Sequence, residues 1–504
     1  QVSGGTFNKS ISEGYCADGF IPTKNADGTY GVKEGHYVAQ VGSTKYETLA
    51  DAIRLAAKGK TVQLLTDATE NITIAANKQI TLDLNGHTIN GGTGNANAAI
   101  LNKGNVAITD TSAGKTGTIK RDDQGIENEK SHYVIDNNGT MVIDQASVFN
   151  NSGKEGSKQG SSLVRNGGVD NVSSLTINGG TLTSKQSVVQ NWNKAQILGG
   201  NLTGIIWTDS WTEAGTIGET VIGGNAQYTG RIYMDVTSSN PSTLKIEGGR
   251  LNVTQWAVTE AASTVDSSIA VSGGTFTAAV PGDYCAAGYD PVANADGSYG
   301  VKLAEGAYLL QDYRSGDLAS WTYPTQEGMA FAGWYKDAKL TTPCTAEDVE
   351  GAAYAKFVKI TDLLKFKGGS LRMDVGDEAS STNLRFGYTK AIPEGSEYLE
   401  NGWYFKKIGS SQSKDVRKLA KKNVLNSDGT VTSNLVFTGV TTNYYDVTFS
   451  EKAFVKYVTA DGTTVEAVEG DYQQRSVKEV AKLILQHSMA SQAEKDYAIK
   501  ILAA

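Results

Sequence analysis

The stretch Leu175-Thr176-Ile177-Asn178-Gly179-Gly180 shows the repeating unit that decides the fold. Apolar and polar residues alternate over four positions, which is typical of a strand with one buried face, and the glycine pair allows a sharp turn after it. The pair recurs at Gly199-Gly200, Gly223-Gly224, Gly248-Gly249 and Gly273-Gly274, at spacings of 20, 24, 25 and 25 residues. Because such periods are typical of stacked units, the sequence predicts a parallel β solenoid with about three short strands per coil.

Looser copies of this pattern extend the repeat toward the N-terminus, at 81–86, 105–110 and 140–144. We therefore expect roughly nine or ten coils between about residues 60 and 280. A solenoid must cover its first coil, because bare strand edges promote aggregation. A helix over 48–58 is expected to provide this cover, since Thr48 and Asp51 form a capping-box pattern and Gly59 follows as a stop.

A long duplication relates the beginning of the chain to its middle. Val2-Ser3-Gly4-Gly5-Thr6-Phe7 returns as Val271-Ser272-Gly273-Gly274-Thr275-Phe276, 269 positions later and without a gap, and the same offset relates Cys16 to Cys285. These two cysteines therefore occupy equivalent places in separate copies, and no disulfide between them is expected. We predict that Cys16, Cys285 and Cys344 are small buried residues, because three scattered cysteines form neither a disulfide framework nor a zinc site.

The chain is predicted to be mainly β and to consist of four parts. Residues 1–35 are the tail coil and hairpin of a preceding copy, and 36–305 form a parallel β-helix with an N-terminal capping helix and a C-terminal hairpin. Residues 306–358 form a small β module. Residues 359–504 form a β-sandwich-like domain that ends in two helices, the second opened by a Ser491 and Glu494 capping box.

Three runs near the beginning of the solenoid carry a resemblance to a known class of domains. Residues 48–53, 61–67 and 80–89, the last containing Leu-Asn-Gly-His-Thr-Ile, resemble the opening of pectate-lyase-like β-helix domains in surface proteins of gut Firmicutes. The resemblance covers about residues 40–280. It implies a right-handed β-helix and an exported protein, whose export signal and anchor we expect outside this fragment.

A second resemblance covers the small module. Residues 329–337 and 353–357 resemble the internalin-type B repeat, a β module of bacterial adhesins, although Phe357 replaces the expected closing Trp. Together the two resemblances imply a non-catalytic, extracellular protein of the bacterial cell surface. In this reading the β-helix is a stiff spacer that binds a glycan or a host glycoprotein.

Charge and hydropathy exclude two kinds of partner. The net charge of −8 argues against nucleic acid, because phosphate binding needs clustered Lys and Arg. The sequence has no uninterrupted apolar stretch of roughly 18 to 20 residues, so no membrane span is expected in this fragment. We expect a monomer within a longer chain.

A search for catalytic chemistry finds no assembled site. Asp122-Asp123 follows Gly86-His87, which reverses the order that polygalacturonases use, and the four histidines show no metal-ligand spacing. Arg231, Asp235 and Asp209 are the best candidates for a lyase cluster, but such residues are more often solvated side chains. We therefore expect no catalytic residue, metal or cofactor. A polysaccharide lyase or glycoside hydrolase acting on the 190–256 face is the competing hypothesis.

The candidate binding site is aromatic. Trp207 and Trp256 each follow the second glycine of the preceding pair by seven residues. The same offset is nine residues for Tyr233, eleven for Trp211 and twelve for Trp192. Equal offsets predict side chains in register along one face of a solenoid. Such a strip, with Asp209 and Gln255 beside it, would stack on sugar rings and hydrogen-bond their hydroxyls. The alternative is that these tryptophans fill the interior or pack under a neighbouring domain.

Overall fold

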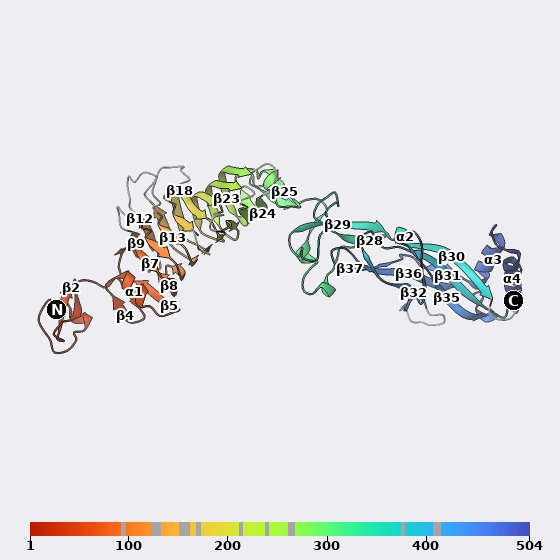
Figure 1. Cartoon of the computed structure of the whole chain (residues 1–504), viewed down its shortest axis with the longest axis horizontal. Helices are drawn as coiled ribbons and strands as arrows, with labels where there is room; N and C mark the ends of the chain where they lie inside the picture. The colour runs from red at the N-terminus through yellow and green to blue at the C-terminus, as the bar shows by residue number, and fades with distance from the viewer. Residues whose placement is uncertain are drawn as a thin grey trace. The chain divides into compact units, whose positions relative to one another are not determined.

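The computed structural model forms two compact units, Gln1–Lys302 and Leu303–Ala504 (Figure 1). The structure describes residues 1–91, 97–121, 133–150, 162–167, 173–210, 215–236, 241–260, 268–373, 379–406 and 415–504. Strands dominate both units, and the chain ends in two helices, so the predicted mainly β class with two terminal helices is confirmed. The finer division into four parts stays a prediction.

The first unit is built from stacked parallel strands. From β7 to β16, each strand pairs in parallel with the strand three places before it, the strand three places after it, or both. The chain therefore passes through three strand positions in each coil. The first position is occupied by β5 (Lys60–Leu64), β8 (Gln79–Asp83), β11 (Asn105–Thr109), β14 (Thr140–Ile143), β17 (Ser174–Ile177), β19 (Lys194–Ile197) and β21 (Glu219–Ile222).

The second and third positions merge in the later coils. The second position holds β6 (Ala68–Thr69), β9 (Thr88–Gly91), β12 (Thr118–Arg121) and β15 (Ser147–Asn150), and the third holds β7 (Ile72–Ile74), β10 (Ile100–Asn102), β13 (Ile135–Asn137) and β16 (Val164–Asn166). Longer strands then run through two or more positions: β18 (Thr181–Asn191), β20 (Asn201–Thr208), β22 (Gln227–Val236), β23 (Thr243–Glu260) and β24 (Ile269–Phe276).

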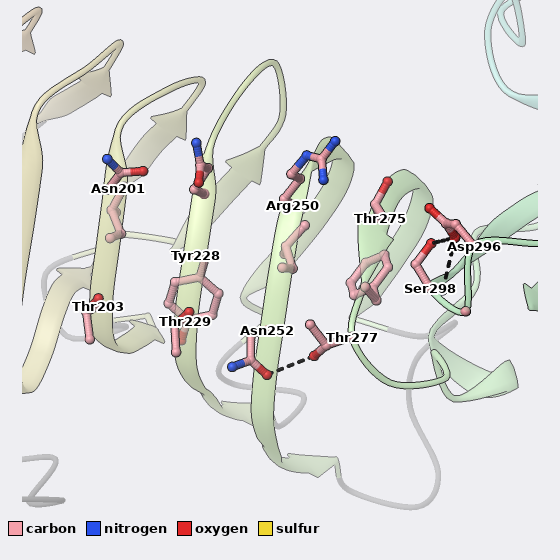
Figure 2. Close-up of a pocket in the computed structure, with 15 residues that line it drawn as sticks. Asn201, Thr203, Tyr228, Thr229, Arg250, Asn252, Thr275, Thr277, Asp296 and Ser298 are labelled. Carbon is pink, nitrogen blue, oxygen red and sulfur yellow. Dashed lines mark hydrogen bonds between the residues drawn. The ribbon is translucent and has the colours of Figure 1, made fainter. Parts of the chain in front are cut away.

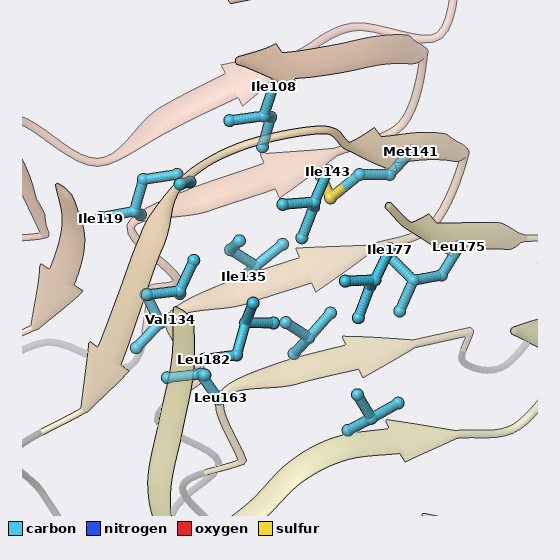
Figure 3. Close-up of a cluster of buried hydrophobic side chains, with 14 of the residues drawn as sticks. Ile108, Ile119, Val134, Ile135, Met141, Ile143, Leu163, Leu175, Ile177 and Leu182 are labelled. Atoms are coloured by element: carbon cyan, nitrogen blue, oxygen red, sulfur yellow. The ribbon is translucent and has the colours of Figure 1, made fainter. Parts of the chain in front are cut away.

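Columns of aliphatic side chains fill the interior of the coils (Figure 3). Register places Ile108, Ile143, Ile177, Ile197, Ile222 and Ile246 in one continuous column. Each of these side chains is fully buried. The alternating pattern seen in the sequence therefore lines up its apolar face from coil to coil, because a parallel ladder sets equivalent residues side by side.

A helix and an antiparallel hairpin cover the first coil. Helix α1 (Leu49–Leu55) begins where the Thr48 hydroxyl accepts a hydrogen bond from the Asp51 N–H, and it buries Leu49, Ala52 and Ile53. Strand β3 (Ala39–Val41) pairs with β4 (Thr44–Tyr46) and with β5, in both cases antiparallel. The predicted capping helix is thus confirmed, and it ends three residues earlier than expected.

The duplication predicted from the sequence is also a duplication of structure. Val2 bridges Cys16 as Val271 bridges Cys285, and Phe7 pairs with Tyr30 as Phe276 pairs with Tyr299. The hairpin strands are β1 (Phe20–Lys24), β2 (Tyr30–Glu34), β25 (Tyr289–Ala293) and β26 (Tyr299–Leu303). All three cysteines are free thiols.

The second unit consists of antiparallel sheets around one core. A three-stranded sheet, order β27-β29-β28, is followed by the sheets β30-β31-β35-β34 and β33-β32-β36-β37, with β38 beside β36. Their strands are β27 (Ala307–Leu309), β28 (Met329–Tyr335), β29 (Ala352–Lys359), β30 (Leu364–Met373), β31 (Ser381–Lys390), β32 (Glu397–Phe405), β33 (Val416–Leu419), β34 (Asn423–Leu425), β35 (Val431–Thr441), β36 (Phe449–Val458), β37 (Thr464–Val468) and β38 (Gln473–Arg475).

Aromatic pairs join the two larger sheets. Phe437 on β35 lies 5.5 Å from Phe405 on β32 and 4.8 Å from Phe449 on β36, measured between ring centroids. Helix α2 (Ile360–Leu363) precedes these sheets, and α3 (Val477–Gln486) and α4 (Gln492–Ala503) follow them. The capping box that opens α4 is confirmed, because Ser491 and Glu494 bond each other's backbone N–H groups.

One predicted strand of this unit is wrong. The aromatic and β-branched residues of 444–449 predict a strand, but a 3₁₀ turn spans Thr442–Tyr444 and β36 begins only at Phe449. The Tyr445 side chain is fully buried and its hydroxyl donates to the Ala379 carbonyl. This tertiary contact holds the segment in a turn despite its β-forming aromatic residues.

Candidate functional site

An aromatic row lies on the outer surface of three neighbouring coils. Trp207 on β20 is paired with Gln190 on β18 and with Tyr233 on β22. Ile206 and Thr208, which flank Trp207 in the strand, are fully buried, so the Trp207 side chain points away from the interior. Register thus brings Trp207 and Tyr233 together, although their offsets from the glycine pairs differ.

The rings of this row touch edge to face. Trp207 lies 6.4 Å from Trp192 at an interplanar angle of 77°, and 5.6 Å from Tyr233 at 87°. The Trp207 indole N–H donates to Asp209 Oδ2 at 3.3 Å. All three rings are half-buried. We call Trp192, Trp207 and Tyr233 the aromatic row; Asp209 lies at its edge.

Trp256 does not join the aromatic row. In the pairing of β22 with β23, Gly230 lies opposite Val253, but the next residue, Arg231, lies opposite Gln255. Thr254 is therefore an extra residue in β23. Trp256 therefore stands opposite the buried Ile232, packs against the core, and lies 5.2 Å from Tyr284. The seven-residue offset consequently does not keep Trp207 and Trp256 in register, because a bulge adds one residue to the later strand.

The remaining two predicted residues are Gln255 and Trp211. Gln255 is exposed beside Arg231 on a neighbouring position of the strand. Trp211 lies outside the described residues. Among the described residues, the aromatic site therefore consists of three rings and one carboxylate.

The outward positions before the aromatic row are polar. Arg165 is paired with Gln190 on one side and Asp136 on the other, and its guanidinium makes two hydrogen bonds to Asp136, at 2.9 and 2.6 Å. The guanidinium also lies 4.5 Å from the centre of the Tyr133 ring. A charged pair, the buried Gln190 amide and then the rings thus follow one another in register from coil to coil.

A buried asparagine ladder supports this surface from inside. Each side-chain amide donates to the next at 2.7 Å, and every member is fully buried; the members are Asn102, Asn137, Asn166 and Asn191. The last one donates to Thr220 Oγ1 at 2.9 Å. Sequence reasoning missed this ladder. Its signal was a β-branched residue two positions before each asparagine, at the end of a short strand pattern.

A groove of about 560 Å³ lies over the second strand position of the last coils (Figure 2). Two parallel rows of side chains line it, one of Asn201, Gln227, Arg250 and Thr275, the other of Thr203, Thr229, Asn252 and Thr277. The Thr277 hydroxyl donates to Asn252 Oδ1 at 2.8 Å. Nothing in the sequence-based search identified this groove, because its polar residues look like any solvated strand face.

The hairpin at the end of the unit closes the groove at one side. Asp296, at its tip, accepts hydrogen bonds from the Ser298 N–H at 3.0 Å and hydroxyl at 2.6 Å. These bonds, helped by the Arg250 charge, hold the pKa of Asp296 below its usual value. The described groove lining thus offers many neutral hydrogen-bonding groups, one guanidinium and one carboxylate.

The described residues show no metal centre: no three His, Cys, Asp or Glu side chains among them are grouped to hold an ion. His87 lies 3.6 Å from Asp67, while Asp122, Asp123 and His132 fall outside the described residues. Burial raises the pKa of the Cys344 thiol to about 11, which disfavours the reactive thiolate.

Comparison with known proteins gives no relative. No family model, no curated protein and no solved structure matches this chain. In the described part of the chain, no helix has the length and apolar character needed to cross a bilayer.

Proposed function

We propose that this chain is a non-catalytic glycan-binding protein of the bacterial cell surface, and that its first unit is a right-handed parallel β-helix. The aromatic row of Trp192, Trp207 and Tyr233 is the observation that carries the proposal. The glycan is free or attached to a host glycoprotein. The coils serve as a stiff spacer for this surface.

The handedness follows from a general rule of strand connection. The first unit is a series of parallel strands joined by crossovers. Such crossovers are right-handed in about 98% of cases, because the twist of the strands favours that path. A right-handed coil is therefore the proposed form of the stack.

The aromatic row suits a sugar because its rings are held in place before binding. Edge-to-face contacts on both sides of Trp207, and its bond to Asp209, restrict the rotamer of the indole. A ligand then loses little affinity to side-chain ordering. The apolar faces of sugar rings stack on such surfaces, and a nearby carboxylate accepts hydrogen bonds from hydroxyl groups.

A glycan and host-glycoprotein array with the purified chain tests this proposal. The double variant Trp207→Ala, Tyr233→Ala is expected to weaken binding by about tenfold or more, as removal of central aromatic contacts does. Tyr15→Ala is the matched control, because Tyr15 is 69% exposed in the 3₁₀ turn Glu13–Tyr15, outside the row, and should leave binding unchanged. Circular dichroism checks that each variant is folded.

Three other results would contradict the proposal. Equal binding by the double variant, with loss in Arg250→Ala, would place the site in the groove rather than on the aromatic row. Release of shortened or unsaturated sugars during incubation would show a lyase or hydrolase, the competing hypothesis. If the chain binds no glycan on the array, the binding part of the proposal is wrong and only the role as a spacer remains.

A further inference from the structure

A buried lysine and a buried asparagine meet between the two larger sheets of the second unit. Lys390 ends β31 in one sheet and Asn401 lies on β32 in the other, and each is only 2% exposed. Lys390 Nζ lies 3.1 Å from Asn401 Oδ1 and 2.8 Å from the Gly402 carbonyl oxygen. The Trp403 ring lies 4.1 Å from the same nitrogen. The amine is therefore directed at the side-chain amide.

The environment of Lys390 favours the neutral amine. Both of its hydrogen-bond acceptors are uncharged oxygens, and its third neighbour is an apolar ring. Burial lowers the pKa of Lys390 to about 7, so that a large fraction is unprotonated near neutral pH. An unprotonated amine is a nucleophile.

The surroundings of Asn401 favour attack on its carbonyl carbon. The Ser433 hydroxyl donates to Oδ1 at 3.2 Å, where negative charge develops when an amide is attacked. On the opposite side, Nδ2 donates to the Tyr398 hydroxyl at 2.6 Å and to Asn423 Oδ1 at 3.0 Å. Tyr398 is 38% exposed, so the leaving nitrogen faces a route to solvent.

A buried acid belongs to the same polar cluster. Glu451 on β36 is fully buried, and burial raises its pKa to about 8, so that it carries a proton near neutrality. Its Oε1 is bonded to the Tyr388 hydroxyl at 2.7 Å, while Oε2 has no hydrogen-bond partner among the described residues. Glu451 thus holds a proton in the interior near neutrality. Its charge, when present, and that of the nearby Glu469 raise the pKa of Lys390, but they offset only part of the lowering by burial.

We propose that Lys390 and Asn401 join in an intramolecular amide bond that links the two sheets. Lys390 Nζ forms a bond to Asn401 Cγ, and the bond from Cγ to Nδ2 breaks. One proton passes from Nζ to the departing nitrogen, which leaves as ammonia. The exchange of one amide for another is balanced and needs neither oxidant nor cofactor. Nζ lies 3.1 Å from Oδ1, the oxygen bonded to Cγ, so the contact already holds the amine beside the group that it attacks.

Intact mass of the denatured full chain tests the proposal directly. The expected mass is lower than the sequence mass by one ammonia molecule. Lys390→Met and Asn401→Ala should restore the sequence mass, whereas Lys406→Met, which removes an exposed lysine nearby, should keep the deficit. A wild-type chain with the full sequence mass would overturn the proposal even where a variant does not fold.

A tryptic digest separates this bond from another reaction that also loses ammonia. Asn401 precedes Gly402, and such a pair can cyclise on its own backbone to a succinimide. Trypsin cannot cut after an acylated Lys390, so residues 386–406 should remain one peptide that carries the deficit. Cleavage after Lys390, or a deficit that persists in Lys390→Met, would show the succinimide and overturn the proposal.

Discussion

The two units of the molecule bury their cores in different ways. The first unit stacks Ile, Leu, Val and Ala in columns, and its buried polar side chains include a repeating amide ladder. The second unit buries large aromatic rings, among them Trp334, Trp403 and Tyr388, together with ionisable groups. In the columns and the ladder of the first unit a contact is repeated in the next coil, whereas the contacts of the second core are not part of a repeat.

This difference determines how each unit should respond to damage. A repeated core distributes stability over nearest neighbours, so that one coil supports the next. A core with single buried charges depends on each partner, because removing one leaves an uncompensated charge. Substitutions should therefore have their largest effects in the second unit.

The largest effect is expected at the Arg314 and Asp461 pair. Their side chains are 0% and 1% exposed, and Arg314 Nη2 lies 2.7 Å from Asp461 Oδ1. Arg314→Ala leaves a buried carboxylate without its cation, and should lower the free energy of unfolding of this unit by about 3 to 5 kcal/mol. Hydrogen exchange in β36 and β37 measures the loss.

The matched control is an exposed pair in the same unit. Lys478 Nζ lies 3.0 Å from Asp446, whose side chain is 79% exposed. Lys478→Ala should cost less than about 1 kcal/mol, because solvent screens such pairs. Equal losses for both variants would show that burial of the Arg314 pair does not govern stability here.

Glu451 gives the second unit a dependence on pH that the aliphatic columns lack. Its folded pKa, about 8, lies above the ordinary 4.5, so the folded state holds the proton more tightly than the unfolded chain. The contribution of Glu451 to the free energy of unfolding is therefore complete below pH 4.5, and it is lost as the pH rises through 8. Urea unfolding between these values should show stability falling by roughly 2 to 4 kcal/mol.

Two comparisons sharpen this pH experiment. Glu451→Gln removes the titrating group and should flatten the curve. Lys390 should make stability depend on pH in the opposite direction. Its folded pKa, about 7, lies below the ordinary 10.5, so stability rises with pH between those values. A chain in which Lys390 is acylated has no amine to titrate, so the proposed amide bond predicts that this rise is absent.

The sequence predicted the features that depend on local or repeated patterns. The strand alternation around Ile177, the helix start at Thr48 and the capping box at Ser491 each need only a few neighbouring residues, and the structure contains all three. The duplication was likewise visible, because equal residues at a fixed offset form equal bridges, as Val2 and Val271 do.

Features that depend on distant partners could not be predicted. One extra residue in β23 moves Trp256 from the outer face to the core, and no local pattern marks that bulge. The contact between Lys390 and Asn401 needs two sheets to pack together, and an isolated lysine reads as a surface residue. The three residues of the aromatic row were therefore among the sequence candidates, whereas their register and the contact between Lys390 and Asn401 could not be predicted.

The smallest effects distinguish two asparagines of the first unit. Asn137 lies inside the buried ladder, where Asn137→Ala would remove one hydrogen bond from each of Asn102 and Asn166, at a cost of about 1 to 3 kcal/mol. Asn201 is exposed on the groove row, so Asn201→Ala should change the free energy of unfolding by less than about 0.5 kcal/mol. Urea unfolding of both variants makes the comparison. Equal small changes would mean that neighbouring coils compensate for a broken ladder, which would extend the tolerance of the repeated core to its polar contacts.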